Sequence, residues 1–445
     1  MTRTHITTRF LRAVVLPVLC AVTATIAPAA DQASFRVVSY LKGSYSTPVS
    51  LTEGAPGVFY LVGGGSNNTA FSITTQGSKT ILATFPAGTF VDGMLVSGAN
   101  NRFYSTVQQS TNPANIFSVG SESGSQQTYP AVDRLAVPTQ NLPDENLLGV
   151  GIALSGNPSY LTSTSLSGGA VTIYTFPAGQ RLPNTAIYAS DGNYYGVAYL
   201  QDASAYVYRI TPSGSFTIVH NFPANTLVGS PDWVPLLQAA DGNLYGATPT
   251  GGANGTGTIY KLTLGGEYTL LYTFPRGRSY NPGALIEGSD GNLYGATDGT
   301  SEKSLLFRIS TSGQYALLHT MELGTDGVCQ CQLTQGSDGM IYGTASGGGP
   351  TGGGVVFALN AGLPKPAPQA RQFSPASGAV GTRVRIWGYN LLSASVGFNG
   401  AASATLYNSG PNYVWATVPA GATTGPITVT TPGGTSVTTA SFTVK

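Results

Sequence analysis

Charged side chains are scarce in this chain. Asp, Glu, Lys and Arg make up 9% of its 445 residues, and the formal net charge is +1. This composition gives no basis for nucleic-acid binding, which requires Lys and Arg to be concentrated on one face. Histidine is rarer still, with 3 residues, so catalysis by a histidine base is not expected. No Ser-His-Asp set, zinc-ligand spacing or phosphate-binding loop occurs, and we therefore expect neither a cofactor nor a metal.

Cysteine is equally rare. Cys20 lies in the N-terminal segment, and Cys329 and Cys331 are the only others. Two cysteines one residue apart are compatible with a small local disulfide, with pairing between molecules or with two free thiols. They cannot cross-link a chain of this length, so the fold must be stabilised by its hydrophobic core.

Long hydrophobic runs are missing, apart from one near the N-terminus. An apolar stretch from Ala13 to Ile26 follows three arginines and is followed by Ala27-Pro-Ala29. This order predicts a secretory signal peptide over residues 1–30. We therefore expect a secreted protein in the extracellular space, at the cell surface or in the periplasm. We expect no transmembrane segment in the mature chain.

Glycine is abundant, with 59 residues, and much of it belongs to a repeat. The clearest copies are Asp241-Gly-Asn-Leu-Tyr-Gly-Ala-Thr248 and Asp290-Gly-Asn-Leu-Tyr-Gly-Ala-Thr297. The fifth position of this signature recurs seven times, at Tyr60, Tyr104, Leu148, Tyr195, Tyr245, Tyr294 and Tyr342. The intervals of 44 to 50 residues match one four-stranded propeller blade. We predict an all-β fold in which residues 31–363 form a seven-bladed β-propeller.

Each repeat supplies four short strands. In the sixth repeat they are expected at Ala284–Gly288, in the signature itself, at Leu305–Ser310 and at Gln314–Thr320. The last repeat has no fourth strand after Val355–Leu359, whereas Ser34–Leu41 has the missing pattern. Because an unpaired sheet edge is a liability, we predict that Ser34–Leu41 completes the last blade.

A proline-rich linker at residues 364–370 ends the repeat. Residues 371–445 then show short alternating strands separated by turns, the pattern of an immunoglobulin-like β-sandwich. No Asp or Glu occurs between Pro364 and Lys445, whereas this segment contains five basic residues. Such a charge asymmetry between two parts of one chain suggests docking or an external partner.

Both parts resemble known families. The run Phe373-Ser-Pro-Ala-Ser-Gly-Ala-Val-Gly-Thr-Arg-Val-Arg-Ile-Trp-Gly-Tyr-Asn390 is similar to the IPT/TIG family of immunoglobulin-like domains, and Val396-Gly-Phe-Asn-Gly400 continues the match. That resemblance implies a binding or spacer role and no catalytic residues. Gly-Ser-Asp290-Gly-Asn-Leu-Tyr-Gly295 resembles the GloVer tandem repeats of secreted bacterial proteins. This second resemblance implies a secreted, surface-associated protein of unassigned activity.

The aspartates of the signature have two interpretations. Either they are calcium ligands or acids, or they are residues of tight Asp-Gly turns, whose positive dihedral angles Asp-Gly suits. Equivalent positions in separate blades lie far apart, so these carboxylates cannot converge on one ion. We therefore predict turn residues without metal at Asp191, Asp241, Asp290 and Asp338.

Two histidines fall at one strand position of the repeat. His220 and His319 occupy the place that Ala83, Tyr174 and Tyr272 hold in other repeats. A position that accepts Ala, Tyr or His is most simply a packing position, which is our prediction for both histidines.

The loops after the Phe-Pro marker of each repeat, as at Phe274-Pro275, concentrate polar and aromatic residues. They are expected on one face of the ring, where propellers commonly bind ligands. The competing interpretation is that loops are polar simply because they are solvated. The predicted ligand-binding residues are Asp232, Trp233, Arg276, Arg278 and Tyr280.

A second candidate surface lies in the C-terminal segment. Strand alternation turns Val384 and Ile386 inward and places their neighbours on the outer face. The predicted basic and aromatic patch consists of Arg383, Arg385, Trp387, Tyr413 and Trp415. Such a patch suits an anionic glycan, docking on the propeller, or no ligand at all, since scattered exposed aromatics are ordinary.

These observations predict a secreted, non-catalytic binding or scaffold protein that recognises an extracellular or cell-surface glycan or protein. The alternative is a secreted carbohydrate-active enzyme, a lyase or glycosidase, with acidic residues at the mouth of the propeller channel. Two carboxylates about 5 to 9 Å apart at that mouth would favour the enzyme, and their absence would favour binding.

Overall fold

A computed structural model describes residues 33–445, with gaps at 43–50, 64–67, 87, 99–101, 110–114, 121–125, 130–135, 143–145, 152–157, 166–168, 181, 183–185, 201–203, 224–234, 278–279, 299–302, 330–331, 351 and 404–405. The expected signal peptide lies outside this part of the chain. The described residues contain strands and turns but no helix, so none of them forms a helix that could span a membrane.

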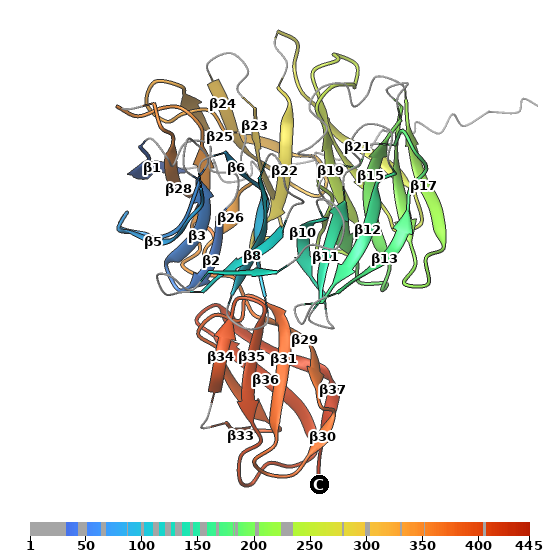
Figure 1. Ribbon diagram of the computed structural model, residues 1–445, viewed down its shortest axis with the longest axis vertical. Helices are drawn as coiled ribbons and strands as arrows, with labels where there is room; N and C mark the ends of the chain where they lie inside the picture. Colours follow the sequence, from blue (N-terminus) through green and yellow to red (C-terminus); the bar gives the residue numbers. More distant parts are fainter. Residues whose placement is uncertain are drawn as a thin grey trace, which may run out of the picture. The chain divides into compact units, whose positions relative to one another are not determined.

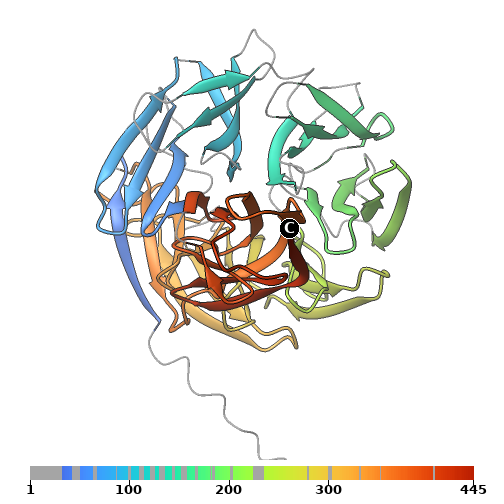
Figure 2. The same cartoon turned by 90° about the horizontal axis from the view of Figure 1, so that it is seen from below.

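The described residues form seven antiparallel sheets of four strands each around a central axis (Figure 1, Figure 2). Six of them consist of four consecutive strands. The first three contain β2 (Leu51–Ala55), β3 (Val58–Gly63), β4 (Thr69–Thr74) and β5 (Lys79–Thr84); β6 (Thr89–Ser97), β7 (Phe103–Gln109), β8 (Asn115–Val119) and β9 (Gln127–Tyr129); and β10 (Ala136–Asn141), β11 (Leu147–Gly151), β12 (Tyr160–Thr164) and β13 (Ala170–Thr175).

The next three sheets repeat this order. They contain β14 (Ala186–Tyr188), β15 (Tyr194–Tyr199), β16 (Ala205–Ile210) and β17 (Phe216–Phe222); β18 (Leu237–Gln238), β19 (Leu244–Thr248), β20 (Thr258–Leu262) and β21 (Tyr268–Thr273); and β22 (Pro282–Glu287), β23 (Leu293–Thr297), β24 (Lys303–Ile309) and β25 (Tyr315–Glu322). The signature thus forms the turn before the second strand of a sheet and that strand itself.

The seventh sheet combines both ends of the repeat region. It contains β26 (Thr334–Gln335), β27 (Ile341–Ala345) and β28 (Val355–Asn360), and its fourth strand is β1 (Ser34–Tyr40). β1 runs antiparallel to β28, with Phe35 opposite Leu359 and Tyr40 opposite Val355. The predicted closure of the ring by the N-terminal strand is therefore confirmed.

The glycine of the Leu-Tyr-Gly motif is needed for packing within a sheet. A Cβ atom on Gly246 would lie 2.4 Å from the hydroxyl of Tyr260, and one on Gly295 would lie 2.6 Å from the ring of Phe307. Only glycine lets the aromatic ring of the third strand cross the second strand so closely. This explains the glycine that follows the fifth signature position in five of the seven copies; Leu61 and Ser105 stand there in the first two.

The outermost strand of most sheets carries a bulge at one place. Between β16 and β17 the register passes from His220 to Ile218, which leaves Val219 unpaired with the neighbouring strand. The same shift skips Leu271 in β21 and Leu318 in β25. A bulge in an edge strand twists it and hinders pairing with another chain.

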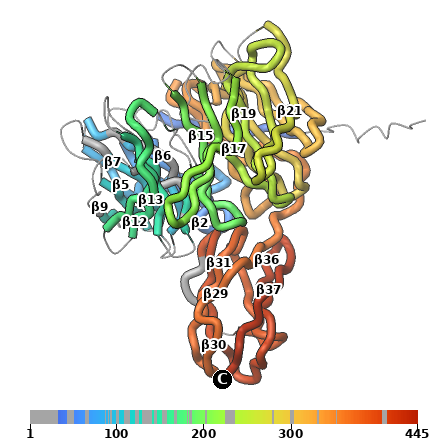
Figure 3. The backbone as a smooth tube through the Cα atoms, turned by 90° about the vertical axis from the view of Figure 1, so that its right-hand side faces the viewer, coloured from blue at the N-terminus to red at the C-terminus, as the bar shows by residue number. Residues whose placement is uncertain are grey.

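Residues 369–444 form two further sheets around a separate core (Figure 3). We call this part the C-terminal module. One sheet has the order β29 (Gln369–Ser374), β31 (Arg383–Tyr389), β35 (Tyr413–Thr417) and β34 (Leu406–Gly410). The other has the order β30 (Ser377–Gly378), β37 (Gly434–Val444), β36 (Gly425–Thr431), β32 (Ser395–Phe398) and β33 (Ala401–Ala402). Val384, Ile386 and Val414 of the first sheet and Ile427 and Val429 of the second are fully buried in this core.

Candidate binding site

The Asp-Gly turns are built around one carboxylate each. Asp241 Oδ1 accepts the backbone N–H of Asn243, and its Oδ2 accepts the side chains of Asn243 and Tyr245 at 2.8 and 2.7 Å. Gly242 follows with a φ of 82°. Equivalent bonds form at Asp191, Asp290 and Asp338, so the prediction that these residues shape turns is confirmed. In the described part of the chain, no cluster of three or more His, Cys, Asp or Glu could hold a metal ion.

A series of polar links joins neighbouring sheets beside these turns. The residue just before the turn aspartate donates its backbone N–H to a Gln or Glu side chain on the first strand of the next sheet. The links are Ser190 to Gln238, Ala240 to Glu287, Ser289 to Gln335 and Ser337 to Glu53, at 2.7 to 2.9 Å. Sequence reasoning missed them, although a Gln or Glu three residues before the turn aspartate was a visible signal.

Glu53 makes the link that closes the ring. Its carboxylate accepts the backbone N–H groups of Gly57 and Ser337 and the hydroxyl of Ser337. The residue is 7% exposed, and burial raises the pKa of its carboxyl group although these hydrogen bonds oppose the change. The first and seventh sheets are thus also joined by a desolvated acid.

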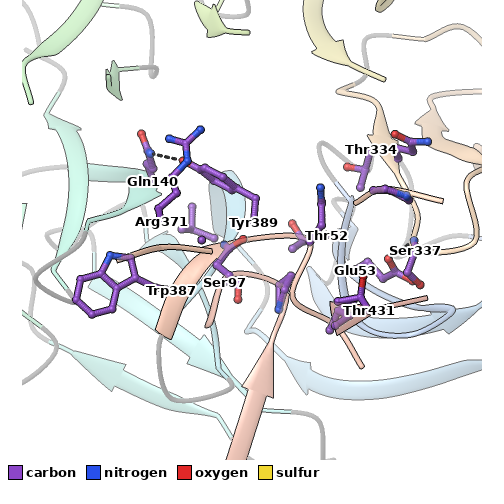
Figure 4. Close-up of a pocket in the computed structure, with 18 of the residues that line it drawn as sticks. Thr52, Glu53, Ser97, Gln140, Thr334, Ser337, Arg371, Trp387, Tyr389 and Thr431 are labelled. Carbon is purple, nitrogen blue, oxygen red and sulfur yellow. Dashed lines mark hydrogen bonds between the residues drawn. The ribbon is translucent and has the colours of Figure 1, made fainter. Parts of the chain in front are cut away.

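A pocket of about 910 Å³ lies where the first strands of several sheets end (Figure 4). The ring contributes apolar side chains, among them Leu51, Leu95, Val96 and Leu142, and polar ones: Thr52, Glu53, Ser97, Gln140, Ser190, Thr334, Gln335 and Ser337. The C-terminal module contributes cationic, aromatic and small polar residues, among them Arg371, Arg385, Trp387, Tyr389 and Thr431. Glu53 is the one carboxylate among the described residues of the lining.

Two hydroxyl groups of the ring wall can act as hydrogen-bond acceptors for a ligand. Thr52 donates its hydroxyl proton to the carbonyl of Leu95 at 2.6 Å, and Ser337 donates its proton to Glu53. A hydroxyl that has given its proton to the protein keeps lone pairs for a ligand. These two oxygens can therefore accept hydrogen bonds from the hydroxyl groups of a bound molecule.

The predicted patch of the C-terminal module lies on one face of a sheet. Arg385 pairs with Trp415 across β31 and β35, and Trp387 pairs with Tyr413. Arg383 and the two tryptophans retain exposed surface, but Arg385 is 5% and Tyr413 1% exposed. These two residues therefore do not form an open surface.

Packing accounts for the burial of Arg385 and Tyr413. The guanidinium of Arg385 lies 5.3 Å from the ring of Trp387 and 5.8 Å from that of Tyr413. Gly410 leaves room for the tyrosine, because a Cβ there would be 2.7 Å from the ring of Tyr413. Burial lowers the pKa of Arg385.

Two residues that the sequence did not single out connect the two walls. Gln140 of β10 donates a long hydrogen bond of 3.5 Å to the hydroxyl of Tyr389. The guanidinium of Arg371 lies 4.6 Å from the centre of the Tyr389 ring. Figure 4 shows Arg371, Tyr389 and Gln140 together at the pocket.

The predicted loop residues lie elsewhere. Arg276 is exposed and donates to the side chain of Asn254 at 3.2 Å, and Tyr280 stacks on Phe274. Neither lines the pocket, since these loops precede the first strands and the pocket lies at the opposite ends of such strands. Asp232, Trp233 and Arg278 lie outside the described residues. Cys329 is disulfide-bonded, and Cys331 is also outside the described residues.

The chain is similar to β-propeller proteins. Residues 182–364 match the Gloeobacter/Verrucomicrobia repeat, and no curated protein matches the sequence. A streptogramin B lyase structure has a TM-score of 0.54 and 17% identity, and the match covers 74% of this chain and 98% of the lyase. For a catalytically inactive virginiamycin B lyase from Staphylococcus aureus with quinupristin, the TM-score is 0.52 and the identity 14%. This match covers 74% of this chain and 99% of that lyase. For the WD40 β-propeller domain of Doa1 the TM-score is 0.49 and the identity 12%, and the match covers 73% of this chain and 97% of that domain. Identities this low show the fold alone.

Proposed function

We propose that the ring, whose residues 182–364 match the Gloeobacter/Verrucomicrobia repeat, is a seven-bladed β-propeller that binds a glycan without catalysis. In this proposal the C-terminal module is an IPT/TIG immunoglobulin-like sandwich. The ligand lies in the pocket that the ring and the module line together.

The composition of the pocket carries this proposal. Its ring wall combines hydroxyl and amide groups with apolar side chains, and its module wall adds Arg371, Trp387 and Tyr389. Sugars present hydroxyl groups that both donate and accept, together with apolar C–H faces that pack on aromatic rings. The volume of about 910 Å³ falls within the range of pockets that enclose small ligands, about 300 to 1,000 Å³.

The carboxylate count of the pocket favours binding over hydrolysis. A glycosidase of the usual type needs two carboxyl groups flanking the scissile bond. The described lining contains Glu53 alone, and that carboxylate already accepts three hydrogen bonds from the protein. A glycosidase of that type would need a second carboxyl group, which this pocket does not present among its described residues.

Export of the protein is also part of the proposal. The N-terminal sequence has the pattern of a signal peptide, and the disulfide at Cys329 suits an oxidising compartment. A secreted, surface-associated location would give the pocket access to extracellular or cell-surface glycans.

A glycan array probed with the mature protein, residues 31–445, tests this function. We expect binding to a defined group of glycans, and no released sugar when the same glycans are incubated with the protein. Trp387→Ala should weaken binding by at least about tenfold, equivalent to about 1.4 kcal/mol. Trp415→Ala is the matched control, because Trp415 lies on the same sheet face but outside the pocket lining. Release of sugar, or binding to no glycan, would contradict the proposal.

A further inference from the structure

We propose that the pocket recognises the carboxylate of an acidic sugar, a uronic acid, and that Arg371 is the residue that pairs with it. This inference rests on the proposed glycan-binding function. It adds the charge of the ligand and the residue that binds the charged group.

The distribution of charge in the pocket favours an anion. Arg371 and Arg385 both line it, whereas its one described carboxylate, Glu53, is held by donors from the ring itself. The C-terminal module contains no Asp or Glu, so its own sequence cannot supply a carboxylate to either arginine. A pocket of this composition attracts a ligand with negative charge.

Arg371 has the geometry to bind a carboxylate with two parallel hydrogen bonds. Its guanidinium is oriented by the ring of Tyr389, 4.6 Å away, and its Nη2 donates to Gln369 at 3.3 Å. Among the described residues it makes no salt bridge. A guanidinium has five N–H donors in a planar fork, so enough remain for a bidentate carboxylate pair.

Trp387 supplies a neighbouring aromatic surface. Its indole Nε1 is buried, and within the described part of the chain it has no hydrogen-bond partner. Figure 4 shows the indole beside the pocket, at the same wall as Arg371. Because this nitrogen has almost no accessible surface, a ligand in the pocket would contact the half-buried indole ring, on which the apolar face of a sugar can pack.

The test compares two forms of one oligosaccharide. The intact mature protein is titrated calorimetrically with an oligogalacturonate and with the same compound after reduction of its carboxyl groups. We expect the acidic form to bind at least about tenfold more tightly. This advantage should shrink as salt is added, since ions screen an exposed charge pair.

Variants of the arginine identify the residue responsible. Arg371→Gln should abolish the preference for the acidic form, whereas Arg371→Lys should retain part of it, because Lys keeps the charge without the planar fork. Lys445→Gln is the matched control: it removes one positive charge from the same module at an exposed residue outside the pocket lining. Its preference should equal that of the unmodified protein.

Equal binding of both forms would overturn this inference and leave the proposed glycan-binding function standing. A preference that survives in Arg371→Gln would overturn the role of Arg371. If neither form binds, the inference also fails, and the glycan array then decides the proposed function separately.

Discussion

The imidazole ring of His319 lies flat against the ring of Phe35, with 4.1 Å between the centroids and 5° between the planes. His319 belongs to β25 and Phe35 to β1, so this stack attaches the N-terminal strand to the sixth sheet. The same contact recurs between other neighbouring outer strands, in the pairs Tyr174–Phe216, His220–Tyr268 and Tyr272–Tyr315. Both histidines pack against a ring of the next outer strand, as predicted, and His319 Nε2 also lies 3.3 Å from a carboxylate oxygen of Asp326.

Removal of residues 31–42 is expected to destabilise the whole ring rather than to loosen one end. β28 would lose its hydrogen-bonded neighbour and become an open edge, and β25 would lose the stack on Phe35. Thermal unfolding followed by circular dichroism should show a decrease in Tm of about 10 °C or more, since about 1 kcal/mol corresponds to about 2–4 °C in domains of this order of size.

His319→Ala is the reference variant with which the stability loss of the deletion is compared. It removes the stack and the contact of His319 with Asp326 but leaves the β1–β28 pairing intact, and the lost stack should cost about 0.5–1.5 kcal/mol. An equal loss of stability in the deletion and in His319→Ala would show that strand pairing does not close the ring.

Asp241→Asn is expected to weaken the protein mildly. Asn-Gly also suits this turn, but an asparagine has one acceptor oxygen where Asp241 uses two. The loss of about one hydrogen bond corresponds to about 0.5–1.5 kcal/mol. Urea unfolding at neutral pH measures it. A loss above about 3 kcal/mol would indicate that the carboxylate does more than shape the turn.

The same variant should change the response to acid. Burial by itself would raise the pKa of Asp241, but hydrogen bonds from Asn243 and Tyr245 outweigh it and lower this pKa below 3.8. A lowered folded-state pKa means that the carboxylate stabilises the fold above its unfolded-state pKa, and that this contribution is lost as the pH falls through the folded-state pKa. Asp241→Asn should therefore lose less stability than the unmodified protein below about pH 4.

The repeat could be predicted from sequence because its signals are local. The spacing of the tyrosines and the Asp-Gly turn reflect contacts within one sheet, as in the bond from Tyr245 to Asp241. The closing strand was also predictable, since Ser34–Tyr40 supplies the pattern that the last repeat lacks.

The candidate site was predictable only in part. Strand alternation correctly placed Arg385 and Trp387 on the face opposite Val384 and Ile386, but burial of Arg385 depends on the aromatic rings packed against it. The bond from Gln140 to Tyr389 joins residues 249 positions apart. No local pattern in the sequence indicates such a contact, because it depends on how distant segments pack.

Glu53 should make stability fall as the pH rises through the mildly acidic range. Burial raises the pKa of this carboxyl group above 4.5, and the charge of Asp338 adds to the effect. The unfolded chain therefore ionises first, so the stability present below pH 4.5 is lost as the pH rises through the folded-state pKa.

Glu53→Gln removes this titration and should flatten that part of the profile. Urea unfolding between about pH 4 and pH 7 compares it with Glu267→Gln, a control at an exposed carboxyl group in the turn before β21. Parallel profiles for Glu53→Gln and the unmodified protein would contradict the prediction.

Gly266 lies at a joint between neighbouring sheets, where added volume should not be tolerated. Its φ is 96°, and a Cβ atom would lie 2.5 Å from the backbone carbonyl oxygen of Val219, the bulged residue of the preceding sheet. Gly242 is the matched control, because its φ is 82° and nothing lies within 4 Å of its added Cβ.

Gly242→Ala should therefore report the backbone strain alone, about 1–2 kcal/mol. Gly266→Ala should add a steric cost of about 1–3 kcal/mol, since a backbone oxygen cannot move aside as a flexible side chain can. Urea unfolding of both variants measures the difference. Equal losses would mean that the bulge yields to the new methyl group, and the contact between Val219 and Gly266 would then not hold neighbouring sheets in place.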